Sequence, residues 1–169
     1  MIRPILRHGA AALHRPSQPV VDFGPDLQTL IDDMIETMYA APGVGLAAPQ
    51  VGVELRAFVA DPSSGRSIGE LVTVINPTVV SKEGIQPEEE GCLSIPGFSA
   101  RVDRPAHLVV RGVNREGEEL EVAGNGLLAR ILQHELDPLD GTLFVDRLHG
   151  LRRDLIMRRV RKMQRAGKW

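Results

Sequence analysis

The chain has 169 residues, of which 43% are hydrophobic and 25% charged, and its formal net charge is −2. These proportions are typical of one globular domain spanning residues 1–169, and no apolar run reaches the length of a membrane span, so an integral membrane protein is excluded. Arginine and proline interrupt the apolar residues at the N-terminus before a secretory signal could form, which predicts a cytoplasmic protein.

The first predicted element is an amphipathic helix over residues 26–38. Apolar side chains recur there at every third or fourth position, which predicts one buried face, and Pro25 suits the first turn. The helix must end by Pro42, and small residues then predominate as far as Gln50. We therefore expect a close-packed loop over residues 42–50.

Short β-rich stretches separated by turn residues follow, and their spacing favours antiparallel strands. The predicted strands cover residues 55–60, 71–75, 78–80, 108–113 and 118–122. A hairpin turn is expected at residues 114–117, and Asn125 suits the N-cap of a following helix. Strands that precede a helical region indicate an α+β fold.

Two helices are predicted in the last third of the chain. Residues 126–137 are apolar around much of the helix circumference, so this helix is expected to be buried and central. A basic amphipathic helix follows, with the predicted inner stripe Leu151, Leu155, Ile156, Val160 and Met163. Residues 151–169 carry eight Arg or Lys against one Asp. This charge favours either a polyanionic partner such as RNA or a solvated helix face.

His134 and Glu135 are unusual on a buried helix, because charged side chains in apolar surroundings are costly to desolvate without a partner or an ion. In the motif H-E-x-x-H, two histidines one helical turn apart bind a metal and the glutamate transfers protons. Here the last position of the motif is Pro138. The pair alone is therefore only weak support for a metal site.

Three segments together identify a family. Residues 43–50, 90–94 and 133–141 read GVGLAAPQ, EGCLS and QHELDPLDG. In order and spacing they resemble the three motifs of peptide deformylases, and the likeness extends from residue 7 to residue 146. The resemblance implies an α+β fold in which antiparallel sheets surround a central helix bearing His134 and Glu135, with a C-terminal helix. It also implies hydrolysis of the N-formyl group of formylmethionyl nascent peptides.

The resemblance implies roles for nine residues. Cys92 and His134 match metal ligands, and Glu135 matches the carboxylate that takes a proton from water and returns it to the departing amine. One divalent metal is implied, Fe(II) in the family, with Zn, Ni and Co as substitutes. The oxyanion donors match the Gln50 side-chain amide and the Leu93 backbone N–H. The peptide-binding positions are Gly45 for the backbone and Val44, Leu127 and Ile131 for the methionine side chain.

The family also implies partners. N-formylmethionyl peptides are the expected substrates, and the helix over residues 151–169 resembles the element by which bacterial deformylases approach the ribosome. We expect neither a membrane nor DNA as a partner. The acidic run Glu88-Glu89-Glu90 reads most simply as a solvated charge run, although Glu90 belongs to the family motif.

Pro138 departs from the family at the third metal ligand, where peptide deformylases have histidine. Proline has no side-chain donor for a metal, and inside a helix it removes the hydrogen bond to the carbonyl of His134. It is also expected to move Asp137 out of helical geometry. Impaired activity follows from either effect, and the substitute third ligands considered are Asp137 and water.

Two other functions fit the residues. One is a non-catalytic descendant that keeps the peptide cleft and binds formyl-peptides or the ribosome. The other is a metal-free thiol hydrolase in which Cys92 attacks and His134 acts as base, which alkylation would inactivate and chelators would not affect. Metal content and turnover distinguish these possibilities.

Overall fold

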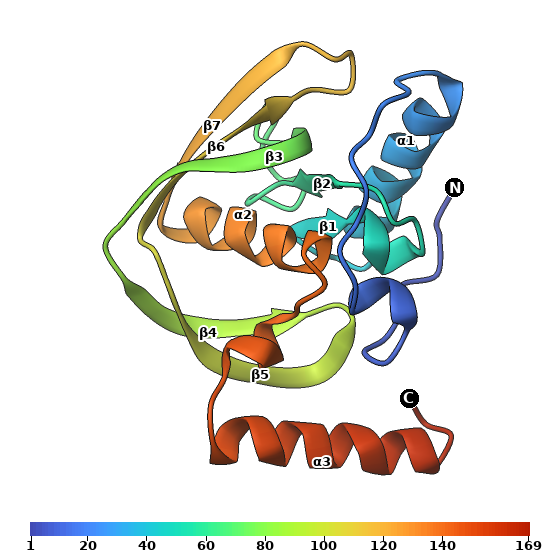
Figure 1. Cartoon of the computed structure of the whole chain (residues 1–169), viewed down its shortest axis with the longest axis vertical. Helices are drawn as coiled ribbons and strands as arrows, with labels where there is room; N and C mark the ends of the chain where they lie inside the picture. Colours follow the sequence, from blue (N-terminus) through green and yellow to red (C-terminus); the bar gives the residue numbers. More distant parts are fainter.

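Two antiparallel sheets lie on either side of a central helix in the computed structural model, which describes residues 1–169 (Figure 1). The helices are α1 (Pro25–Ala40), α2 (Gly126–Leu139) and α3 (Leu151–Arg165). The strands are β1 (Gly45–Ala47), β2 (Ala57–Ala60), β3 (Val72–Glu83), β4 (Gln86–Cys92), β5 (Ile95–Arg104), β6 (His107–Val113) and β7 (Glu119–Asn125). The predicted α+β fold with a central helix and a C-terminal helix is confirmed.

The larger sheet has the strand order β1-β2-β3-β6-β7, and the smaller one pairs β4 with β5. Only short connections separate β3 from β4 and β5 from β6, so two long ribbons curve past α2 from one sheet to the other (Figure 1). The helix is thereby enclosed, and β1 is left as an edge strand beside it. This edge forms part of the site described below.

Three apolar clusters make up the core. The first lies between α2 and the larger sheet and includes Phe58, Val110 and Leu132, all fully buried. The second joins α1 to β1 and β2, and the third joins the β4–β5 hairpin to the segment after α2 and to Val160 of α3. Apolar contacts therefore hold α2 against the larger sheet, and its contacts with the β4–β5 hairpin are polar.

Several local predictions were wrong. Residues 42–50 contain β1 and a short 3-10 helix rather than a loop alone, and the strands predicted over residues 71–75 and 78–80 are parts of one strand, β3, with two register shifts against β6. Asn76 adopts a positive φ of 52° at the first shift, where its side chain bonds the backbone of Val20. The β4–β5 hairpin was not predicted, because charged and turn-forming residues dominate its sequence.

Helix α3 lies beneath the β4–β5 hairpin (Figure 1). Its predicted inner stripe is only partly right: Val160 is buried and Ile156 and Met163 are half-buried, whereas Leu151 and Leu155 are exposed. The helix contacts the body mainly through its second half, so its first turn has no apolar surface to cover these leucines. No helix of the chain is both long and apolar enough to cross a membrane.

Candidate catalytic site

One cavity of about 530 Å³ opens between the edge of β1, the end of β4 with its turn into β5, and one face of α2. It is lined by all nine residues selected from the sequence: Val44, Gly45, Gln50, Cys92, Leu93, Leu127, Ile131, His134 and Glu135. The helix over residues 126–137 was expected to be buried, but Leu127 is 54% exposed at the rim of this cavity. The fold therefore brings three separate segments to one place, while the individual roles remain predictions.

Glu135 lies at the bottom of the cavity with 3% of its surface exposed. Burial is the main cause that raises the pKa of its carboxyl group to about 7, and the negative charges of Glu90 and Asp137 act in the same direction. Its Oε2 atom makes no hydrogen bond within the protein. A buried carboxylate oxygen of this kind is suited to a water molecule or a substrate atom, and a pKa near 7 suits proton transfer.

Gly45 explains how the carboxyl group reaches the cavity. A Cβ atom at this position would lie 2.6 Å from Oε1 of Glu135, closer than any tolerated contact. The absence of a side chain therefore lets the edge of β1 approach the glutamate directly. The backbone of β1 and the carboxyl group face the same space.

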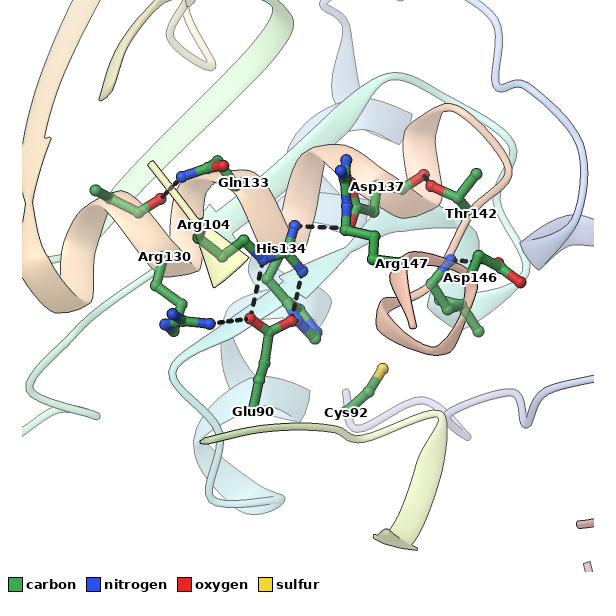
Figure 2. A network of polar contacts seen from close by, with 12 residues as sticks. Glu90, Cys92, Arg104, Arg130, Gln133, His134, Asp137, Thr142, Asp146 and Arg147 are labelled. Carbon is green, nitrogen blue, oxygen red and sulfur yellow. Dashed lines mark hydrogen bonds and ion pairs between the residues drawn. The ribbon is translucent and has the colours of Figure 1, made fainter. Parts of the chain in front are cut away.

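His134 is oriented from behind by Glu90 (Figure 2). Its Nδ1 atom lies 2.5 Å from Oε2 of Glu90, and because a carboxylate only accepts hydrogen bonds, Nδ1 carries a proton and Nε2 is left to bind a metal. Burial lowers the pKa of His134, but contacts with Cys92 and Glu90 outweigh it and raise that pKa well above its usual value. Cys92 is also buried, and it lines the same cavity as His134 and Glu135. A thiol sulfur and an imidazole nitrogen therefore lie in the cavity that contains Glu135.

Glu90 is the centre of a buried ion network, shown in Figure 2. Besides His134, its carboxylate accepts hydrogen bonds from Arg104 (3.0 and 2.5 Å) and from Arg130 (2.9 Å). Burial acts to raise the pKa of Glu90, but His134 and Arg104 lower it to about 2, so the carboxylate stays ionised. The interpretation of this acidic run as solvated was wrong for Glu90, which is 7% exposed.

Asp137 extends the network on the other side of Arg104. Its carboxylate accepts a hydrogen bond from Arg104 at 2.9 Å and two from Arg147 at 2.6 and 2.9 Å. The side chain is buried and does not line the cavity. The proposed use of Asp137 as a substitute metal ligand is therefore contradicted, because both carboxylate oxygens are bound to arginine.

Pro138 lies within α2, which continues to Leu139. The expectation that proline would move Asp137 out of helical geometry was wrong. Pro138 removes only the one bond that its N–H would donate to the carbonyl of His134, and Arg104 and Arg147 hold Asp137 in place. The helix is thus preserved although the side chain at this position cannot donate to a metal.

Gln50 and Leu93 line the cavity beside Cys92. The Gln50 side-chain oxygen accepts the N–H of Ala47 at 2.9 Å, and its nitrogen donates to Oγ of Ser94 at 3.1 Å and to Sγ of Cys92 at 3.8 Å. Leu93 is in the turn after β4, and its N–H makes no backbone hydrogen bond. The Leu93 N–H is therefore available to an oxyanion, whereas the Gln50 amide must exchange one of its present partners to donate to one.

The donor set fits a metal only in part. Cys92 and His134 are a thiol and an imidazole of the kind that binds Fe, Zn, Ni or Co. No group of three or more His, Cys, Asp or Glu side chains in the chain is arranged to hold a metal ion. Two ligand side chains are present and the third is missing.

Sequence reasoning missed the outer part of the site. Arg104, Arg130 and Arg147 come from β5, α2 and the segment after α2, and none lies in a motif that marks it as functional. Glu90 carried the one available signal, since it stands two residues before Cys92. Buried arginines are recognisable only once their carboxylate partners are located.

Comparisons with known proteins agree on one family. The sequence model described as polypeptide deformylase matches residues 2–154. A peptide deformylase of Acidobacterium capsulatum is 48% identical over 169 residues, which is 100% of this chain and 99% of that protein, and one of Thermodesulfovibrio yellowstonii is 44% identical over 95% and 97% of the two chains.

Solved structures give the same result. A peptide deformylase from Legionella pneumophila superposes with a TM-score of 0.91 and 44% identity over 99% of this chain and 98% of that one. A peptide deformylase from Ehrlichia chaffeensis in complex with actinonin has a TM-score of 0.88 and 35% identity over 97% and 98% of the two chains.

Proposed function

The chain belongs to the peptide deformylase family, metal-dependent hydrolases that remove N-formyl groups, and from this premise we propose that its own cavity deformylates formylmethionyl peptides with an incomplete set of metal ligands. The observation that carries the proposal is the position of Glu135. Its buried carboxyl group, with a pKa raised to about 7 and one oxygen without a partner, faces the same cavity as Cys92 and His134.

In this proposal Glu135 takes a proton from the attacking water and delivers it to the departing amine. The Gln50 amide and the Leu93 N–H donate hydrogen bonds to the oxygen that becomes negative when the formyl carbon turns tetrahedral. Burial of Gln50 and Glu135 excludes bulk water, which strengthens these interactions. Each group thus acts on an atom whose charge changes during the reaction.

Cys92 and His134 are the residues that would hold the metal, with Fe(II) as the family metal. When bound, a divalent ion acts as a Lewis acid and lowers the pKa of water to roughly 7. Glu90 supports this role by fixing the His134 ring with Nε2 free. Because Pro138 offers no donor, we expect weak metal retention and impaired turnover.

The edge of β1 supports peptide binding. An edge strand has unpaired backbone N–H and C=O groups, so an extended peptide can add to it beside Gly45. Val44, Leu127 and Ile131 form the apolar part of the cavity, and they are the proposed contacts of the methionine side chain.

The test is release of a free amine from a formyl-methionyl-alanyl peptide under anaerobic conditions with added iron or nickel. We expect slow turnover that a chelator abolishes, because the metal supplies the Lewis acid. Turnover that resists the chelator and is abolished by alkylation of Cys92 would instead favour the thiol hydrolase. If no condition gives turnover, the binding protein becomes the better description.

We further propose that this single domain, residues 1–169, works in the cytoplasm at the ribosome, where nascent formylated chains emerge. Helix α3 supports this location, because its Arg and Lys residues are mostly exposed and only Arg153 has an ion-pair partner, Asp146 at 3.7 Å. Replacing Arg158 and Arg161 by glutamate is expected to weaken cosedimentation with ribosomes and to reduce its salt dependence. Unchanged cosedimentation would contradict the proposal; Arg111→Glu, on β6, is the matched control.

A further inference from the structure

A second, basic groove adjoins the cavity. Pro96, Gly97 and Phe98, at the start of β5, line the cavity on one side and a groove of about 360 Å³ on the other. The remaining lining of the groove comes from α3, namely Arg159, Lys162 and Met163. A chain that leaves the cavity over the start of β5 therefore reaches the flank of α3.

Helix α3 is held beside the start of β5 by contacts of Trp169, which follows the C-terminal end of the helix. Trp169 donates a hydrogen bond from its indole nitrogen to the carbonyl of His8 at 2.8 Å, and its ring lies 6.2 Å from that of Phe98. The Arg7 guanidinium lies 5.7 Å from the Trp169 ring centre, a cation–π distance. Because Phe98 also lines the cavity, the groove and the cavity share a fixed wall.

The charge of the groove is not compensated from within the protein. The side chains of Arg159 and Lys162 form no hydrogen bond and no ion pair, and both residues are exposed. No acidic residue lines the groove. In the cavity, the exposed carboxylate is that of Glu89, which pairs with Arg101 of β5 and does not line the groove. Two cations thus face solvent at the place where the wall of the cavity ends.

We propose that this groove binds acidic side chains of the substrate downstream of its first two residues, so that the protein prefers formyl-peptides with Asp or Glu there. The proposal rests on the proposed function, since it takes the formyl end to lie at Glu135. An extended peptide advances by roughly 3.3–3.6 Å per residue, and the groove begins where Pro96, Gly97 and Phe98 end the cavity, so residues beyond the first two are the ones that reach it. Gly97, exposed and without a side chain, leaves that path open.

The test compares two hexapeptides, formyl-Met-Ala-Ala-Asp-Asp-Ala and formyl-Met-Ala-Ala-Lys-Lys-Ala, at low ionic strength. In the parent protein we expect kcat/KM to favour the Asp peptide by roughly three- to ten-fold, mainly through KM, because exposed ion pairs are weak and screened by salt. The double change Arg159→Glu with Lys162→Glu is expected to invert this ratio. Arg161→Glu is the control, since Arg161 is an exposed cation of the same helix that does not line the groove.

A second readout separates this inference from the proposed function. Binding of the same peptides, labelled at their C-terminus, is followed by fluorescence anisotropy with metal-free protein, in which turnover does not interfere. A preference for the Asp peptide that the double change removes supports the groove even if no peptide is deformylated. Equal binding of both peptides, or a preference that Arg161→Glu alters as strongly as the double change, would overturn the inference.

Discussion

Replacing Pro138 by histidine is expected to raise both the affinity for metal and the deformylase activity by at least about 100-fold. The change supplies an imidazole one helical turn after His134 and on the same face of α2. Loss of a residue that merely supports a metal ligand already costs roughly 10–100-fold, so loss of a ligand itself should exceed this. Metal bound per chain after gel filtration, and kcat/KM on a formyl-methionyl peptide, are the two measurements.

Pro138→Ala is the control that separates the ligand from the backbone. Both variants restore the N–H that proline lacks, and each should gain at most about 3 kcal/mol of stability, because the site lies in the last turn of α2. Only the histidine variant restores a donor. If the alanine variant recovered activity equally, helix distortion and not the missing ligand would be the cause of impairment.

The second large effect is expected for Glu135→Gln. The amide has nearly the same shape but cannot transfer the proton, so kcat should fall by about 10²–10⁴-fold with metal content unchanged. The measurement is made in the parent chain and in the Pro138→His variant, where the larger starting activity widens the observable range. Glu89→Gln, on the exposed rim of the same cavity, is the matched control.

The same variant should change how stability depends on pH in the metal-free protein. The unfolded state loses the Glu135 proton from about pH 4.5, whereas burial keeps it in the folded state up to a pKa of about 7. The folded protein therefore loses stability as pH rises through this window, by up to about 3 kcal/mol, and Glu135→Gln should remove that loss. Urea unfolding at pH 5 and pH 8 measures the free energy of unfolding of both proteins. If this free energy changed equally between the two pH values in the parent and in Glu135→Gln, the carboxyl group would not be buried as described.

The sequence predicted the inner part of the site well, because motif residues are chemically distinctive. Cys92 ends β4 whereas His134 and Glu135 lie on α2, yet the resemblance to the three peptide deformylase motifs was enough to place them in one cavity. The ion network around Arg104 could not be predicted, since a buried arginine looks like any surface arginine until its partner is known. Glu90 and Asp137 provide those partners from β4 and α2.

The fold was predictable where periodicity was strong. Helices α1 and α2 fall close to their expected limits, because one follows an amphipathic pattern and the other is continuously apolar. The β4–β5 hairpin was not predicted, because its strands bury only part of one face and their sequence is polar and rich in turn-forming residues. Leu151 and Leu155 were misplaced for the opposite reason: they are apolar but meet no surface that would cover them.

The persistence of α2 through Pro138 means that damage to the metal site leaves little trace in the fold. Quality control in the cell responds to unfolded chains, and this chain keeps its central helix, its core and the arginine network around the altered position. A screen for thermal stability or soluble expression would therefore pass it as intact. A missing metal ligand of this kind would be visible to assays of bound metal or of deformylation, and Pro138→His would find the rest of the site already assembled.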